Sequence, residues 1–205
     1  MRHALGVLLL LLFGSANAAL LDRGGGFIYD DVLDTTWMQN AGLSGSDTWD
    51  NQVAWAASLS IYDSVRDSTW DDWRLATTDV NWSGAISLPA DCAVVSEVEC
   101  RSNELGYMFH HNGVNPLASV NYGPFNNLQF SYWSAQPLGE PGGANAWRYN
   151  FIEGSSFVYD KQDWEFHGWA VRDGDVASIV PIPTAIWLFC SGLGLLGWFR
   201  RRQTA

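Results

Sequence analysis

The sequence is poor in the residues from which most catalytic and metal centres are built. Its 205 residues include only three cysteines and four histidines. It contains no His-Glu-x-x-His, no Gly-x-Ser-x-Gly and no glycine loop of the kind that binds phosphate. The central histidines, His110, His111 and His167, have no pattern that builds a nucleophile, base and orienting group. We therefore expect a non-catalytic protein without a cofactor or a metal, in which these histidines are structural or lie at the surface.

Basic residues are also scarce. The chain has 11 Lys and Arg against 22 Asp and Glu, a formal net charge of -11. All the acidic residues lie between Asp22 and Asp175, where only seven basic residues accompany them. Such a surface repels phosphate backbones and anionic lipid, so we expect no nucleic-acid partner.

Tryptophan, in contrast, is abundant, with 12 residues, ten of them in the central region. Large aromatic side chains are usually buried, so we expect roughly seven or eight of the ten in or at the core. The rest could stack on sugar rings, whose C–H faces suit flat rings with one polar edge. Trp133, Trp164 and Trp169, in a half rich in expected loops, are the candidate ligand-binding residues. The alternative for each is a place in the core.

The first 18 residues have the layout of a secretory signal peptide. A basic start at Arg2 precedes an apolar stretch of 11 residues, 4–14, and then Ala16-Asn17-Ala18. The stretch is too short to cross a bilayer, which argues against the alternative of an uncleaved anchor helix. We expect cleavage after Ala18.

The C-terminal segment is long enough to cross a membrane. Residues 179–199 form a run of 21 residues without a formal charge, followed at once by arginines at 200–202. As a helix this run would be about 31 Å long, close to the thickness of the hydrocarbon core. Arginines beside a spanning helix stay in the cytoplasm, so the bulk of the chain is expected on the other side.

The order of features in this tail resembles the PEP-CTERM sorting signal. The matching residues are Val180, Pro181, Pro183, Arg200, Arg201 and Arg202, with the apolar run between them. Ile182 stands where that family usually has Glu. The resemblance implies a Gram-negative bacterium that makes extracellular polysaccharide and an exosortase, a membrane enzyme, that recognises residues 179–205. It also implies a protein held in the inner membrane before processing and then located at the cell envelope or outer surface. A GPI signal is the rival, but such tails end in apolar residues rather than arginines.

Two of the three cysteines are close together. Cys92 and Cys100 enclose seven residues in the exported region, where such a pair predicts a local disulfide. A metal site is the alternative, but no His or third Cys stands nearby to complete it. Cys190 lies in the apolar tail.

Residues 19–178 have the length of one domain, without a linker, repeat or low-complexity run. We expect strands at 27–29 and 35–38, and a helix from Trp49 with Val53, Ala56 and Ala57 on its inner face. A second helix is expected within 102–113, with an apolar face of Leu105, Met108 and Phe109. Alternation predicts later strands around Trp147–Phe151 and Trp169–Val171. Two helices followed by short strands predict an α+β domain.

Seven segments of this region follow the order seen in bacterial DUF1566-type domains. They are TTWMQNA, WDNQVAWAASL, WDDWRLAT, SNELGYMF, GPFNNLQFSYWSA, NAWRYNF and GWAVRDGD. These domains are similar to the C-terminal domain of a Legionella collagen-like adhesin. The resemblance implies a C-type lectin-like fold, with two helices, a short-stranded antiparallel sheet, many loops and paired termini. Ala76 stands where the family usually has Pro.

The sequence contains partial matches to two kinds of polar site, a lectin-type calcium loop and a pair of catalytic carboxylates. C-type lectins hold Ca²⁺ with Glu-Pro-Asn or Gln-Pro-Asp, but the chain has Gln136-Pro137-Leu138 and Glu140-Pro141-Gly142, which lack the third ligand. Asp71 with Asp72, and Asp160 with Asp163, are carboxylate pairs of the kind that a glycosidase uses. Chance pairs are common among 22 acidic residues, so we interpret them as solvated surface.

The sequence thus favours an exported cell-surface or biofilm-matrix protein that binds polysaccharide without catalysis. The alternatives are a purely structural matrix protein, which acts by its bulk and charge, and a glycan hydrolase that uses one of the carboxylate pairs.

Overall fold

A computed structural model describes residues 20–84, 87–117, 122–139 and 142–177. The expected signal peptide, residues 1–18, and the expected sorting signal, residues 179–205 with its helix at 179–199, lie outside these residues. Among the residues described, no helix has both the length and the apolar character needed to cross a bilayer.

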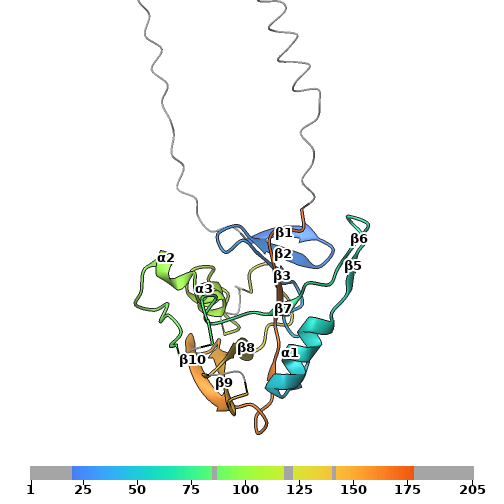
Figure 1. Ribbon diagram of the computed structural model, residues 1–205. Helices are drawn as coiled ribbons and strands as arrows, with labels where there is room; N and C mark the ends of the chain where they lie inside the picture. The colour runs from blue at the N-terminus through green and yellow to red at the C-terminus, as the bar shows by residue number, and fades with distance from the viewer. Residues whose placement is uncertain (1–19, 85–86, 118–121, 140–141, 178–205) are drawn as a thin grey trace, which may run out of the picture.

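The domain is α+β, as expected, and is mostly sheet with few helices (Figure 1). One five-stranded sheet has the order β1 (Leu20–Gly24), β2 (Phe27–Asp30), β3 (Thr35–Met38), β12 (Ala170–Asp173), β7 (Arg74–Leu75). The other has the order β10 (Ser155–Asp160), β9 (Asn145–Asn150), β8 (Ser131–Pro137), β11 (Phe166–His167), β4 (Ser46–Asp47). A two-stranded sheet is formed by β5 (Ile61–Asp63) and β6 (Ser68–Trp70). The helices are α1 (Trp49–Ser58), α2 (Glu97–Cys100) and α3 (Glu104–His110).

The first and last strands belong to the same sheet. Strand β1 pairs with β2, and β12 pairs with β3 through Val171 opposite Trp37. The two ends of the described chain, Leu20 and Ala177, therefore lie at the same end of the domain (Figure 1).

Helix α1 begins at Trp49 as expected, but its inner face differs from the prediction. Ala56 is buried, whereas Ala57 is exposed and Gln52 is buried in its place. Gln52 is tolerated there because its Nε2 donates to the carbonyl oxygens of Gly45 and Phe166, at 2.9 and 3.0 Å.

Helix α3 has the expected buried residues Leu105 and Met108. Asn103 caps it, accepting a hydrogen bond from the backbone N–H of Gly106 at 2.8 Å. The short helix α2 was not expected, although Ser96 and Glu99 form a complete capping box at its start.

The core is built largely from aromatic rings. Trp37 and Trp169 have 0% and 1% exposed surface, and their rings meet edge to face at 4.8 Å. Five of the ten central tryptophans are buried, at positions 37, 73, 133, 147 and 169. Three more, at 49, 55 and 70, pack against the core. This agrees with the expected seven or eight.

The expected disulfide joins Cys92 to Cys100. Both cysteines pack with Tyr107 of α3 in a small cluster apart from the main core. The bridge ties the loop before α2 to the end of that helix, and closing a loop this short stabilises by about 2–3 kcal/mol at most.

The expectation of no internal repeat was wrong. Residues 28–37, IYDDVLDTTW, and residues 61–70, IYDSVRDSTW, are identical at seven of ten positions. Both segments form a hairpin with the same register, in which Ile28 lies opposite Trp37 and Ile61 lies opposite Trp70.

The turns of the two hairpins agree in detail. In the first, Asp30 Oδ1 accepts from the N–H of Val32 and Leu33, both at 3.0 Å, and Tyr29 donates to Asp34 at 2.8 Å. In the second, Asp63 Oδ1 accepts from the N–H of Val65 and Arg66, at 2.9 and 3.3 Å. Tyr62 donates to Asp67, again at 2.8 Å.

Asp34 and Asp67 complete the equivalence, with φ of 51° and 50°. Asp is one of the few residues that enter this left-handed region at low cost. The ten-residue pattern therefore specifies one local structure, which occurs twice.

Candidate functional site

Two cavities adjoin on the surface of the domain. One has a volume of about 550 Å³ and the other about 650 Å³, and Trp82 and Ala135 line both. Each volume is in the usual range for small-molecule sites. We call them the ion-pair cavity and the tryptophan cavity, after the residues that line them.

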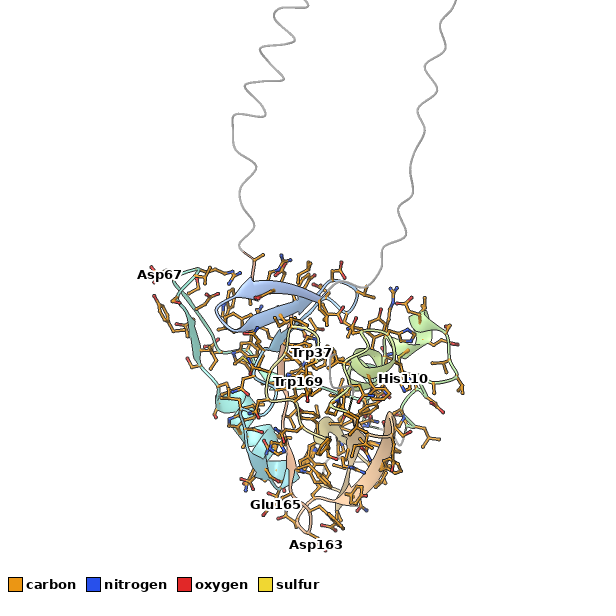
Figure 2. All side chains as sticks on the ribbon, turned by 180° about the vertical axis from the view of Figure 1, so that it is seen from behind. Trp37, Asp67, His110, Asp163, Glu165 and Trp169 are labelled. Carbon is orange, nitrogen blue, oxygen red and sulfur yellow. A yellow bond between two sulfur atoms is a disulfide. The ribbon has the colours of Figure 1, made fainter. Side chains whose placement is uncertain are left out.

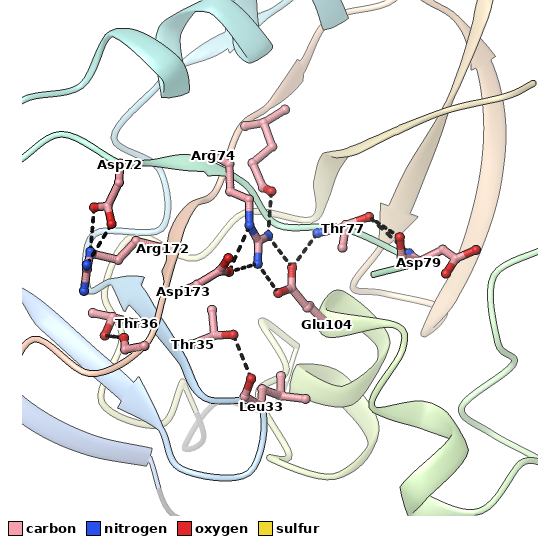
Figure 3. Close-up of polar contacts among 12 residues, drawn as sticks. Leu33, Thr35, Thr36, Asp72, Arg74, Thr77, Asp79, Glu104, Arg172 and Asp173 are labelled. Atoms are coloured by element: carbon pink, nitrogen blue, oxygen red, sulfur yellow. Dashed lines mark hydrogen bonds and ion pairs between the residues drawn. The ribbon is translucent and has the colours of Figure 1, made fainter. Parts of the chain in front are cut away.

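The ion-pair cavity has a network of charged side chains at its wall (Figure 3). Arg74 of β7 and Glu104 of α3 form two parallel hydrogen bonds of 2.7 and 2.8 Å. Arg74 also reaches Asp173 of β12 at 2.6 Å, and Glu104 accepts from the backbone N–H of Thr77 at 2.8 Å. The network thus joins one helix to two neighbouring strands.

These charges are committed to one another. Glu104 has only 2% exposed surface. Burial opposes the charge of Arg74, but its bonds to Glu104 and Asp173 prevail and hold the pKa of Arg74 above its usual value. A buried carboxylate with this many partners holds the neighbouring elements in place and is not available to bind a ligand. Side chains of the Trp73-Arg74-Leu75 segment point alternately to the core and to the cavity: Trp73 and Leu75 are buried, and Arg74 lines the cavity.

The tryptophan cavity combines two indole rings with acidic groups. Trp49 and Trp82 line it together with Asp50, Asp160 and Asp163. Trp49 is held in place because its Nε1 donates to the carbonyl oxygen of Ser134 at 2.8 Å. Flat rings beside carboxylates can offer both stacking and hydrogen-bond acceptors to a ligand.

A lysine lies in this cavity too. Lys161 is 5% exposed, and its Nζ lies 4.1 Å from the ring centre of Trp49. Burial lowers the pKa of Lys161. Among the described residues no carboxylate lies within ion-pair distance of Lys161, so its charge is favoured by the Trp49 ring and, at longer range, by Asp50.

Two of the three predicted tryptophans lie in the core, so their prediction as ligand-stacking residues is corrected. Trp133 is 0% exposed and donates to the carbonyl oxygen of Asp47 at 3.1 Å. Trp169 is 1% exposed and donates to the carbonyl oxygen of Met38 at 2.9 Å. Backbone carbonyls satisfy both indoles, which removes the cost of burying the N–H.

Trp164 is the candidate that remains at the surface, with 49% of it exposed. Its ring stacks on Phe166 at 6.1 Å and meets Tyr159 edge to face at 4.9 Å. The structure does not place it in the lining of either cavity.

An aromatic cage beside Trp164 was missed from the sequence. The guanidinium of Arg148 lies 5.2, 4.8 and 5.1 Å from the rings of Phe157, Tyr159 and Phe166. Burial lowers the pKa of Arg148, which is 8% exposed. Alternation of Phe157 and Tyr159 along β10 was the available signal.

Neither proposed carboxylate pair is arranged as a free acid and base. Asp72 is bound through two hydrogen bonds of 2.7 Å to Arg172, which lowers the pKa of Asp72 (Figure 3). Asp160 Oδ1 accepts from the N–H of Gln162 and Asp163, at 2.8 and 3.3 Å, and so closes a turn.

The lectin-type calcium loop is not formed at Gln136. Its side chain is 1% exposed, accepts from Thr78 at 3.0 Å and donates to Ser87 at 2.9 Å. Residues 140 and 141 lie outside the described part of the chain. The described residues hold no group of three or more His, Cys, Asp or Glu that could bind a metal ion.

The three histidines have structural neighbours. His110 Nε2 lies 2.9 Å from the carbonyl oxygen of Gly154, and His111 packs on Tyr107 at 4.9 Å. Burial lowers the pKa of His167, whose ring lies 6.4 Å from Tyr132.

Trp49, Trp82 and Lys161 were not predicted as site residues. They come from three distant parts of the chain, so no spacing in the sequence indicates that they meet. The sequence matches no protein-family model, and a comparison with curated proteins finds no similar sequence.

Proposed function

We propose that this is an exported cell-envelope protein that binds polysaccharide in the two adjoining cavities and catalyses no reaction. The ligand stacks on Trp49 and Trp82, and its hydroxyl groups bond to the carboxylates that line the tryptophan cavity. The observation that carries the proposal is that two indole rings and three aspartates line one cavity of about 650 Å³.

The proposed binding site extends over both cavities, because they share part of their lining. Because Trp82 and Ala135 border both cavities, one chain of sugar units can occupy the two in sequence. The buried Arg74–Glu104 pair fixes the shape of the second part. Such a preformed site binds a flexible polymer without reorganising the protein.

The architecture supports a C-type lectin-like domain. The proposal rests here on two principal helices, short strands, long irregular stretches and first and last strands that share a sheet. These are the features that the resemblance to DUF1566-type domains implies.

The proposed location at the cell envelope rests on the sequence of the two chain ends. Residues 1–18 export the chain, and residues 179–205 direct it to an exosortase-type enzyme and hold it in the membrane until processing. Asp163 of the tryptophan cavity lies at the end of the domain opposite to β1 (Figure 2). A membrane tether at the C-terminal end of the domain therefore leaves the tryptophan cavity facing away from the membrane.

The test is a glycan array probed with the full-length chain in detergent. We expect binding to at least one polysaccharide, and Trp82→Ala to weaken it roughly tenfold, since each stacked ring contributes on the order of 1 kcal/mol or more. Trp164→Ala is the matched control, because it removes an exposed indole outside both cavities, and it should change affinity less than about twofold.

Two results would decide against the proposal. Absence of binding to every polysaccharide leaves the structural matrix protein, whose acidic surface acts by charge alone. Release of new reducing ends from a bound glycan points to the hydrolase instead.

A further inference from the structure

The second copy of the repeated hairpin lacks the partner strands that the first copy has. In the first, β2 is paired by β1 and β3 is paired by β12. In the second, β5 and β6 form a two-stranded sheet of their own. Figure 2 shows its turn, at Asp67, projecting from the body of the domain.

In the described part of the chain, the second hairpin pairs with no third strand, although Asp63 at the end of β5 is itself buried. Among the described residues, no backbone–backbone hydrogen bond joins Ile61–Asp63 or Ser68–Trp70 to another strand. Its contact with β1 is made at the turn, where Arg66 donates to the carbonyl oxygen of Arg23 at 2.6 Å. An unpaired strand edge is a template for pairing with another extended chain.

Most side chains of the second hairpin are more exposed than their equivalents in the first, because no other strand of the described chain pairs with the second hairpin. Thr36 of the first hairpin is 0% exposed; it pairs with Arg172 of β12 and donates to the carbonyl oxygen of Gly174 at 2.6 Å. Its equivalent Thr69 is exposed. Tyr29 is half-buried, whereas Tyr62 is 61% exposed.

Strand β1 shows what occupies the corresponding edge of the first copy. Leu21 lies opposite Tyr29, and the Arg23 guanidinium lies 5.1 Å from the centre of the Tyr29 ring. Tyr62 has the same orientation toward Asp67 as Tyr29 has toward Asp34. The carboxylate that pairs with Arg23 is Asp175, which lies outside the repeat. The ring that receives the arginine in the first copy is thus repeated, and exposed, in the second.

We propose that β5 is a strand-addition site for an extended, arginine-bearing segment of a partner protein, which pairs with Ile61–Asp63 and stacks its guanidinium on Tyr62. Backbone hydrogen bonds supply the affinity, and the exposed Tyr62 ring selects the basic side chain. The acidic character of the chain, with a formal net charge of -11, favours such a partner over a second copy of itself.

The probe is a fluorescent peptide with the sequence ALLDRGG, residues 19–25, which contains the natural partner strand of the first hairpin. We expect saturable binding to the full-length chain in detergent below about 1 mM, measured by fluorescence polarisation. Replacing Arg23 in the peptide by Ala, or Tyr62→Ala in the protein, should weaken binding about threefold or more. A peptide with both Leu20→Pro and Leu21→Pro should not bind, because one of those N–H groups must point to β5.

A photoreactive residue at position 21 of the peptide locates the contact. We expect the cross-link on Ile61–Asp63. Tyr122→Ala, which removes another exposed tyrosine, is the control and should leave binding unchanged.

Three outcomes overturn the inference. They are a cross-link on β2, which indicates exchange with β1, no saturation at about 1 mM, and equal binding to the Tyr62→Ala protein. A concentration-dependent dimer that Tyr62→Ala disperses would assign the edge to a second copy instead. None of these outcomes depends on glycan binding.

Discussion

The two hairpins of this domain have nearly the same sequence and the same turn, yet they differ in burial and in charge. In the first, Asp30 is buried and accepts from Asn112 at 2.7 Å, and burial raises the pKa of Asp30. In the second, Asp63 is equally buried, but Arg66 lies at 2.6 Å. Burial opposes that charge as well, yet hydrogen bonds from Arg66, Trp70 and Val65 outweigh it and lower the pKa of Asp63.

The comparison shows which residues determine the turn and which determine the charge beside the buried aspartate. The shared residues determine the turn, because the same Asp, Tyr and left-handed Asp recur with the same hydrogen bonds. Of the three differing positions, the one with Leu33 in one copy and Arg66 in the other decides whether the buried carboxylate has a cation. What packs against each hairpin is decided elsewhere in the chain.

The largest expected difference between the copies comes from their tryptophans. Trp37→Ala should cost about 3–5 kcal/mol of unfolding free energy, because Trp37 is fully buried among aromatic rings. Trp70→Ala should cost only about 1–2 kcal/mol, because Trp70 is half-buried where it packs against the core and beside Arg172, whose guanidinium lies 4.3 Å from its ring centre. Urea unfolding measures both, with Trp164→Ala as an exposed control. Equal losses would show that the second hairpin belongs to the core.

Amidation of the two buried aspartates should change the unfolding free energy by different amounts. Asp63→Asn should lower the unfolding free energy by about 2 kcal/mol at pH 7, because the Arg66 guanidinium loses its carboxylate. Asp30→Asn should change it by less than about 1 kcal/mol, because no ion pair is lost there. The measurement is again urea unfolding, with the exposed Glu165→Gln as control.

The pH dependence of these variants sharpens the contrast. The folded pKa of Asp63 is lowered, so its stabilisation is present above the unfolded pKa of about 3.9 and is lost as pH falls through the folded value. The deficit of Asp63→Asn should therefore shrink on acidification. The folded pKa of Asp30 is raised, so its stabilisation is present below about pH 3.9 and is lost as pH rises. Asp30→Asn should therefore gain relative to the unmodified protein between about pH 4 and pH 7. Parallel pH profiles would contradict the assignment.

A smaller effect is expected at Arg23, which serves the first hairpin. Arg23→Ala removes the contact with Tyr29 and the ion pair with Asp175, both partly exposed, and should cost about 1 kcal/mol or less. The loss should decrease at high salt, since the pair is accessible to solvent. A thermal shift that does not depend on salt would indicate that packing, rather than charge, is what Arg23 supplies.

The smallest effect should be the same in both copies. Tyr29→Phe and Tyr62→Phe each remove one exposed hydrogen bond to an aspartate and should cost about 0.5 kcal/mol. Burial and Asp34 raise the pKa of Tyr29 to about 12. Spectrophotometric titration of Tyr29→Phe should therefore lose a phenol that ionises near that pH. A large difference between the two variants would mean that the turn is not a local structure.

Elements with a clear period were predictable from the sequence. Thr35–Met38 was placed as a strand with the bounds that the structure shows, because its aromatic and β-branched residues lie between turn residues. The disulfide followed from the spacing of its cysteines. Strands β7 and β11 have two residues each and were not recognised, since two residues carry no periodicity.

The site was less predictable than the fold. Trp133 and Trp169 were chosen for their place in a loop-rich half, but tertiary packing buries them and satisfies their N–H groups with distant carbonyls. Trp82 and Lys161 are far apart in the sequence and line one cavity only through the tertiary fold. The repeat was visible in the sequence and its structural meaning was not.

The shared sheet of β1 and β12 has one more consequence. A domain whose chain enters and leaves at one end can be spliced into a surface loop of another protein without threading or stretching its host. The end of the domain that carries Asp163 of the tryptophan cavity then points away from the host protein.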